Sequence, residues 1–266
     1  MNFLKNKYVV IKGGLGNQIF QYNLINYLHN SGYHVKYLNF TGDDHNGIEI
    51  TKYFNFNWSE ASLFIYLLYK ISKKLKLNSI FCYDKNLNIN KIFFEGYWYK
   101  PELYMSPSEY ALQTLILNEK NIKIKHIIEH KNSVSLHVRR GDYLLPKNFK
   151  GFGNICTIDY YKRAIDYINC NIINPTYFIF SDDIQWCKDN LKLDQVYYID
   201  WNKNEKSIID FYLMSLCKHH IIANSSFSFW AAYISGDNQV LYPEKWSSGR
   251  DIQFIPKSWI KISINS

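Results

Sequence analysis

The stretch SVSLHVRRGDY, residues 133–143, decides the fold that this sequence predicts. Its first six residues have the length and apolar content of a buried strand, and polar residues follow at once. Further apolar stretches of strand length lie at 177–180, 196–199, 220–223 and 239–242, and helical patterns separate them at 159–169, 184–190, 205–217 and 226–234. Strands that alternate with helices predict a parallel sheet covered by helices on both faces.

The start of the chain reads as another strand–helix–strand unit. A strand at 8–12 leads into the glycine loop GGLGNQ, then a helix at 19–30 that Gly32 ends, and a second strand at 34–38. The middle of the chain is less regular. There, a strand is expected at 92–95, and the sequence SPSE at 106–109 has the capping-box pattern that begins a helix. The change of pattern places a boundary near residue 130, between halves 1–130 and 131–266.

Polar clusters follow four of the predicted strands of the second half. They are His137 to Asp142, residues 181–183, residues 200–201 and residues 224–226. The carboxyl ends of parallel strands meet at one edge of the sheet, where open α/β folds bind their ligands. We therefore expect these clusters to form one ligand site.

The composition excludes a disordered chain, since 47% of the 266 residues are hydrophobic and 18% are aromatic. The net charge of +8 allows three kinds of partner: nucleic acid, an anionic membrane surface or a small polyanion. Five isolated cysteines without a CxxC pair argue against a disulfide framework or a zinc site. With no apolar leader and no run of 18 apolar residues, the sequence predicts a cytoplasmic protein that does not span the membrane.

Residues 62–76 allow two interpretations. The segment is apolar and then basic, ending in Lys70, Lys73, Lys74 and Lys76, as in a helix that lies in a membrane interface. A core helix with a charged last turn would have the same pattern.

The adjacent arginines Arg139 and Arg140 are the strongest candidate for ligand binding. Two guanidinium groups in a turn after a buried strand suit a diphosphate, because each can grip two phosphate oxygens. Alternatively, they are surface arginines paired with Asp142.

Two further clusters are ambiguous. The sequence NSSFS at 224–228 can present backbone N–H groups to a phosphate at a helix N-terminus, or only cap that helix. Asp182 and Asp183 could hold Mg²⁺, bind a base or ribose, or cap the helix at Ile184. The glycine loop at 13–17 matches neither the dinucleotide-binding fingerprint nor the phosphate-binding loop of nucleotide triphosphatases.

Taken together, the motifs resemble the α-1,2-fucosyltransferases of glycosyltransferase family 11. The HxRRxD part is shared with α-1,6-fucosyltransferases and, more loosely, with protein O-fucosyltransferases. In this family the motif EGYW (95–98) is often followed by Gln, whereas this chain has Tyr99, a difference that falls on the side expected to face the acceptor. The motifs that carry the resemblance are GGLGNQIFQ (13–21), EGYW (95–98), HVRRGDY (137–143), DYY (159–161), FSD (180–182) and NSSFSFW (224–230).

The resemblance implies a GT-B-like fold, with two Rossmann-like α/β halves facing across a cleft, and an inverting enzyme that needs no metal or cofactor. GDP-β-L-fucose would bind mainly to residues 131–266, and a galactoside would accept fucose in α-1,2 linkage on the side of residues 1–130. Arg139 would contact the β-phosphate. The other residues implied in donor binding are Gly16, Asn17, Arg140, Asp182, Ser225, Ser226 and Phe227.

On the acceptor side the resemblance implies Glu95 and Trp98. The general base stays open among Asp142, His137 and Glu95, in that order. The expected acceptor is a lipid-linked oligosaccharide with terminal galactose, made for O-antigen or another surface polysaccharide at the inner face of the membrane, and no nucleic acid is involved. The alternatives are a fucosyltransferase of another linkage, such as α-1,6, or a non-catalytic glycan- or RNA-binding module.

Overall fold

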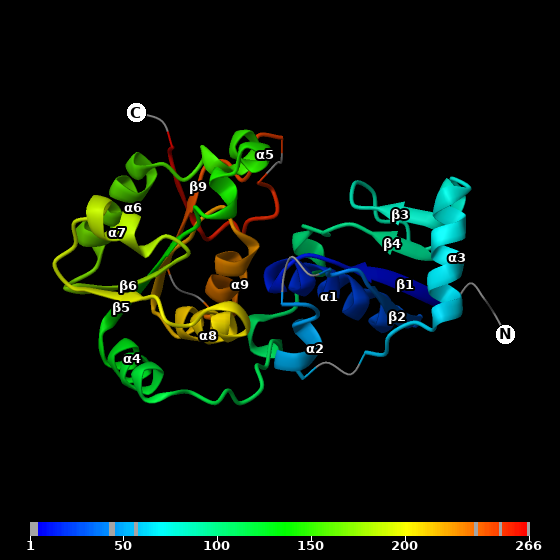
Figure 1. Ribbon diagram of the computed structural model, residues 1–266, viewed down its shortest axis with the longest axis horizontal. Coiled ribbons are helices and arrows are strands. Elements are labelled where there is room, and N and C mark those ends of the chain that lie inside the picture. The colour runs from blue at the N-terminus through cyan, green and yellow to red at the C-terminus, as the bar shows by residue number, and fades with distance from the viewer. Residues whose placement is uncertain (1–4, 43–45, 56–57, 237–238, 250–251, 265–266) are drawn as a thin grey trace. The chain divides into compact units, whose positions relative to one another are not determined.

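The computed structural model describes residues 5–42, 46–55, 58–236, 239–249 and 252–264 (Figure 1). The chain divides into two compact units, residues 1–113 and 114–266, each built on a parallel sheet. The sequence placed the boundary near residue 130. The structure places helix α4 (Glu119–His130) with the second unit, where it packs on strand β5 and helix α8.

The first unit has four parallel strands in the order β2-β1-β4-β3. Val9 and Ile11 of β1 face Leu24 and Leu28 of helix α1, whereas Val10 faces the other side of the sheet, where α3 packs. The alternation of side chains along β1 thus supplies both cores. The elements are β1 (Asn6–Ile11), α1 (Leu15–Asn30), β2 (His34–Asn39), α2 (Ile50–Tyr53), α3 (Leu63–Lys74), β3 (Phe81–Tyr83) and β4 (Phe93–Glu95).

The second unit has six parallel strands in the order β10-β9-β8-β5-β6-β7. Val134 and Leu136 of β5 pack against Ala164 and Ile168 of α6, while His137 faces the opposite side, toward α9. After α4, the elements are β5 (Asn132–Val138), α5 (Pro146–Asn148), α6 (Ile158–Asn171), β6 (Pro175–Ser181), α7 (Ile184–Asn190), β7 (Val196–Ile199), α8 (Ser207–Ser215), β8 (His219–Ile221), α9 (Ser226–Ile234), β9 (Gln239–Pro243) and β10 (Ile260–Ile262).

Most predicted elements are present, with two differences in the first unit. Helix α1 begins at Leu15 and not at Ile19, so that it includes the end of the glycine loop. The capping box at Ser106 forms, but it supports only one turn, Pro107–Glu109, because Tyr110 leaves the helical conformation at ψ 72° and its hydroxyl bonds to Asn23. Strands β3 and β10 and helices α2, α4 and α5 were not predicted.

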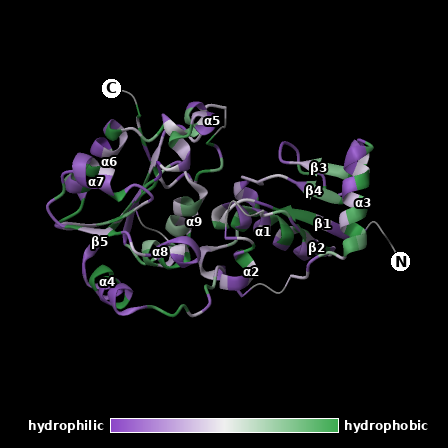
Figure 2. Ribbon diagram, viewed as in Figure 1, coloured by the Kyte–Doolittle hydropathy of each residue, from purple (hydrophilic) through white to green (hydrophobic). Residues whose placement is uncertain are grey.

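Helix α3 packs on the sheet, as the core-helix interpretation of residues 62–76 predicts. Ile65 and Tyr69 are buried against the sheet, as in a core helix, while Leu63, Phe64 and Leu67 are exposed on its outer side. Figure 2 shows the helix as hydrophobic through its first half and hydrophilic toward its basic end. Among the described residues, no helix has both the length and the apolar character needed to cross a membrane.

Candidate active site

Arg139 lies immediately after β5, where two carboxylates hold its guanidinium group. One terminal nitrogen is 2.8 Å from Asp142 Oδ1, and the other is 3.1 Å from Oδ2 of Asp182, which follows β6. The Arg139 side chain is still 34% exposed. The guanidinium is therefore fixed in direction at the carboxyl edge of the sheet but open to a ligand.

Arg140 has a different environment from its neighbour. Its Nε donates to Asp183 Oδ2 at 3.0 Å, and its guanidinium stacks on the Trp186 ring at 4.2 Å. Its backbone N–H donates to Asp182 Oδ1 at 2.8 Å. These contacts tie Arg140 to the start of α7, so its side chain shapes the turn.

The turn itself requires Gly141. A Cβ at this position would lie 2.9 Å from Oδ2 of Asp182, too close for the carboxylate to keep its place. Asp183 also caps α7, accepting from the Trp186 N–H at 3.1 Å. We call residues 139–141 the arginine turn. The contacts of Asp182 and Asp183 go to this turn and to the cap of α7. No group of three or more His, Cys, Asp or Glu side chains within the described ranges could hold a metal ion.

The N-terminus of α9 adjoins the arginine turn. Tyr143, whose ring lies 5.8 Å from the Arg139 guanidinium, donates its hydroxyl to the Asn224 carbonyl at 3.0 Å. Ser225 is the N-cap of α9 and accepts from the Phe227 N–H at 3.4 Å, a long bond for a cap. Ser226, partly exposed, is the first residue of the helix. The structure thus brings the two predicted phosphate-binding motifs together.

His137 lies beneath this cluster and is 7% exposed. Its Nδ1 lies 2.8 Å from Ser228 Oγ, on α9, and its carbonyl accepts from the Tyr161 hydroxyl at 3.2 Å. Burial, with the nearby positive charge of Arg139, lowers the pKa of His137 to about 4, so the imidazole is neutral at pH 7. A neutral imidazole can accept a proton, but this one is shielded from solvent.

In the first unit, Gly16 and Asn17 belong to the first turn of α1. Gly13 has a φ of +77° and lies against Asn17, and Asn17 Oδ1 accepts from the Tyr99 hydroxyl at 2.9 Å. Tyr99 therefore positions Asn17. This contact joins positions 82 residues apart and could not be read from the sequence.

Two residues that the sequence analysis did not single out hold the glycine loop. Gln18 accepts from the backbone N–H groups of Glu49 and Ile50 at 2.8 and 3.0 Å and donates to the Gly13 carbonyl. Gln21 accepts from the Lys12 N–H at 2.9 Å and donates to the Gly96 carbonyl at 3.2 Å. Both side chains are fully buried, so the two glutamines of the motif GGLGNQIFQ hold its glycine loop in place.

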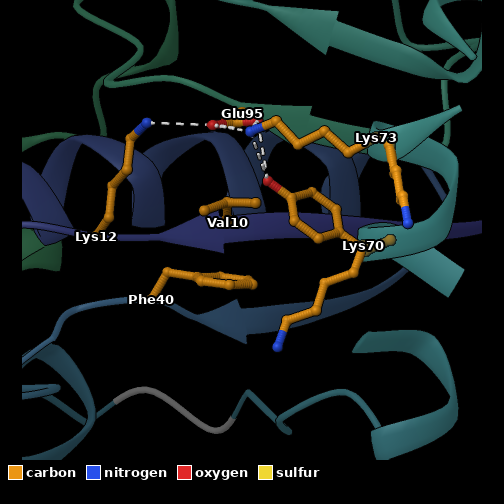
Figure 3. Close-up of a pocket in the computed structure, with 8 residues that line it drawn as sticks. Val10, Lys12, Phe40, Lys70, Lys73 and Glu95 are labelled. Atoms are coloured by element: carbon orange, nitrogen blue, oxygen red, sulfur yellow. Dashed lines mark hydrogen bonds and ion pairs between the residues drawn. The ribbon is translucent and has the colours of Figure 1, made fainter. Parts of the chain in front are cut away.

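The two residues predicted on the acceptor side, Glu95 and Trp98, have different environments. Glu95, at the end of β4, is 2.6 Å from the Lys73 amine and accepts from the Tyr69 hydroxyl at 2.9 Å (Figure 3). Burial alone would raise the pKa of Glu95, but bonds from Lys73 and Tyr69 lower it overall. Trp98 is wholly buried in the core beside Phe94. The prediction that the Trp98 ring contacts an acceptor is therefore not supported by its packing.

Comparison with known proteins adds three findings. The family model described as "Glycosyl transferase family 11" matches residues 83–253. "O-antigen biosynthesis glycosyltransferase WbnK" of Escherichia coli is 37% identical over 55% of this chain, but that alignment spans only half of the relative. "Alpha-1,2-colitosyltransferase" of Escherichia coli is 29% identical over 95% of this chain and 97% of its own length.

A solved structure supports the fold. The structure of POFUT1 in complex with GDP superposes with a TM-score of 0.52 over 90% of this chain and 98% of that chain, at 12% sequence identity. At this identity the likeness shows the fold alone. It agrees with the two parallel α/β units described above, and the GT-B-like architecture is confirmed.

Proposed function

The chain belongs to glycosyl transferase family 11, and from this premise we propose that it moves L-fucose from GDP-β-L-fucose to a galactoside hydroxyl in α-1,2 linkage, with inversion. Membership makes it a glycosyltransferase. The observation that supports the donor is the turn carrying Arg139 and Arg140 beside the α9 N-terminus, since guanidinium groups and helix N-termini both bind oxyanions.

In this mechanism the acceptor hydroxyl oxygen attacks the anomeric carbon of fucose from the face opposite to the diphosphate. The bond from that carbon to the phosphate oxygen breaks, and GDP leaves with the electron pair. Arg139 and the N–H groups at Ser226 and Phe227 stabilise the charge that develops on the β-phosphate. Donors that are already fixed in direction need little rearrangement during the reaction, which makes them effective.

The acceptor proton needs a base, and Asp142 is our first candidate. Its side chain is 44% exposed next to the arginine that would hold the donor. His137 is the second, because it is neutral but buried. Glu95 is the third, because the bonds that lower its pKa make it a weak base. Arg140 and Asp182 hold the turn that carries Arg139.

We further propose a lipid-linked oligosaccharide with terminal galactose as the acceptor, in O-antigen synthesis. The support is the name of the relative WbnK and the exposed apolar side of α3, which suits contact with the inner face of a membrane. A second candidate donor is activated colitose, because the relative that matches almost the whole chain is named an α-1,2-colitosyltransferase.

The test is release of GDP from GDP-fucose with a panel of terminal β-galactosides, followed by linkage analysis of the product. We expect turnover and a fucose on the galactose 2-hydroxyl. If turnover occurred only with activated colitose, the donor would be colitose and not fucose. If the product had another linkage, the α-1,2 assignment would be wrong. Binding of glycan or RNA with no turnover of either donor would refute a transferase and indicate a binding module.

A further inference from the structure

The first unit contains a pocket that the proposed donor site does not use. It has a volume of about 570 Å³, within the range of small-molecule sites. It lies where β1, β2 and β4 end, under the second half of α3 (Figure 3). Its lining residues are Val10, Lys12, Phe40, Tyr69, Lys70, Lys73, Lys74 and Glu95.

The pocket carries four lysines and one carboxylate. Figure 3 shows Lys12 and Lys73 reaching toward Glu95, at 3.5 and 2.6 Å, while Lys70 extends toward Phe40. Within the described part of the chain, neither Lys70 nor Lys74 has an acidic partner within 4.0 Å. Glu95 can balance only one of the four charges, so the pocket has an excess of positive charge that a polyanion would neutralise.

The position of the pocket also favours a ligand. From β1 the chain passes through α1 to β2 on one side, whereas β3 lies beyond β4 on the other side. Lys12 and Glu95 therefore mark the point where the strand order reverses, which is where open α/β sheets bind ligands. Val10, Phe40 and Tyr69 provide apolar walls, which strengthen the attraction between the lysines and an anion.

The outer side of α3 indicates that the ligand also has an apolar part. Leu63, Phe64, Leu67 and Ile71 are 86%, 63%, 56% and 44% exposed, at a spacing that places them on one side of the helix. Three of the four lysines that line the pocket, Lys70, Lys73 and Lys74, belong to the last two turns of the same helix. A ligand with phosphates and an apolar chain would complement both surfaces.

We propose that this pocket binds the phosphate groups of an amphiphile, with Lys70 and Lys74 as the main ligands and the outer side of α3 against its apolar chain. The identity of the amphiphile as the lipid-linked acceptor rests on the function proposed above. The phosphate site itself does not, because it follows from the charges of the pocket.

The first experiment titrates inorganic pyrophosphate into the protein by calorimetry. We expect two classes of site, of which Arg139→Ala removes one and Lys70→Gln/Lys74→Gln weakens the other at least tenfold. As a matched control, Lys52→Gln/Lys85→Gln removes two exposed lysines of the same unit outside the pocket, and binding should stay within twofold. Unchanged binding in the Lys70/Lys74 variant would overturn the proposal. A site sensitive to Arg139 alone would do the same.

The second experiment asks whether the phosphate comes with an apolar chain. Farnesyl diphosphate, below its micelle concentration, should bind at least tenfold more tightly than pyrophosphate, and Phe64→Ser/Leu67→Ser should abolish that advantage. Ile116→Ser, which changes a residue 95% exposed in the other unit, is the control. Equal affinities for farnesyl diphosphate and pyrophosphate would overturn the proposal that the ligand is an amphiphile and would indicate a soluble phosphate instead. Both readouts are binding, so failure of fucosyl transfer leaves them interpretable, and their failure leaves the transfer proposal standing.

Discussion

At the scale of single residues, two neighbouring arginines are held in different ways. Arg139 is oriented by Asp142 and Asp182 but stays accessible, whereas Arg140 is stacked on Trp186 and bonded to Asp183. Sequence position alone treats them as equivalent. The difference in partners assigns charge stabilisation to the first and shaping of the turn to the second.

Arg139→Lys should therefore lower kcat by about a hundredfold or more, while the affinity for GDP falls less. Lysine keeps the charge but loses the planar fork, and an interaction that strengthens in the transition state affects rate more than binding. Arg140→Lys should be milder. Steady-state kinetics and GDP titration measure both. Near-normal turnover by Arg139→Lys, with the fold verified by circular dichroism, would remove Arg139 from the catalytic role.

The choice of general base can be tested at the same scale. Asp142→Asn should lower kcat by about 10²-fold or more, because an amide accepts no proton. Glu95→Gln should change kcat less than tenfold, since Glu95 is bonded to Lys73 and Tyr69. Steady-state kinetics measure both, and a larger loss in Glu95→Gln than in Asp142→Asn would reverse the order of the two candidates.

At the scale of elements, local signals predicted best where the element carries its own cap. Helices α7 and α9 begin where predicted, and their caps, Asp183 and Ser225, are the residues just before them. Helix α1 was predicted too short, because Gln18 and Gln21 bond to backbone far along the chain and favour a helix through the loop. No local pattern records such contacts.

The candidate site shows the same division. Polar residues at strand ends predicted that the arginine turn, Asp182 and the α9 N-terminus would lie together, and they do. The pairing of Arg139 with Asp182, and of Arg140 with Asp183, joins neighbouring strands, and its geometry depends on the register of β5 with β6. Trp98 shows where prediction from a motif fails. It was predicted on the acceptor side because it belongs to the motif EGYW, but its side chain is buried in the core.

The N-terminus of α9 offers a prediction that separates capping from phosphate binding. Ser225→Asp should keep the helix capped, so that the melting temperature changes little, because Asp caps as well as Ser. Its negative charge should repel a phosphate and weaken GDP binding about tenfold or more, measured by calorimetry. Thr157→Asp, at the N-cap of α6, is the matched control. Unchanged GDP affinity in Ser225→Asp would leave Ser225 as a cap alone.

At the scale of the whole molecule, the net charge of +8 fits a protein that binds a small polyanion. In the second unit, the arginine turn and the α9 N-terminus would neutralise the leaving diphosphate without a metal. Transfer should therefore persist in EDTA at a rate within about twofold of the untreated enzyme, because protein cations supply the stabilisation. The measurement is GDP release with and without chelator. Loss of activity that Mn²⁺ or Mg²⁺ restores would instead assign Asp182 and Asp183 to a metal.

The stability of the fold should depend on pH through two buried histidines and one partly buried aspartate of the second unit. Burial lowers the pKa of His137 to about 4 and of His220 to about 3, so between these values and 6.5 the unfolded chain binds two more protons at these sites. Burial raises the pKa of Asp210 to about 7, against an opposing hydrogen bond from Asn202, so the folded chain binds one proton there that the unfolded chain releases.

The net difference is about one proton, and the unfolding free energy should fall by about 1 kcal/mol for each pH unit from 6 to 5. Asp210→Asn removes the opposing group, so the slope should become about twice as steep. Urea denaturation at several pH values measures both, and His34→Gln, which changes an exposed histidine, should leave the slope unaltered. A flat profile, or the same slope in Asp210→Asn, would show that these groups are not buried in the ionisation states that their packing requires.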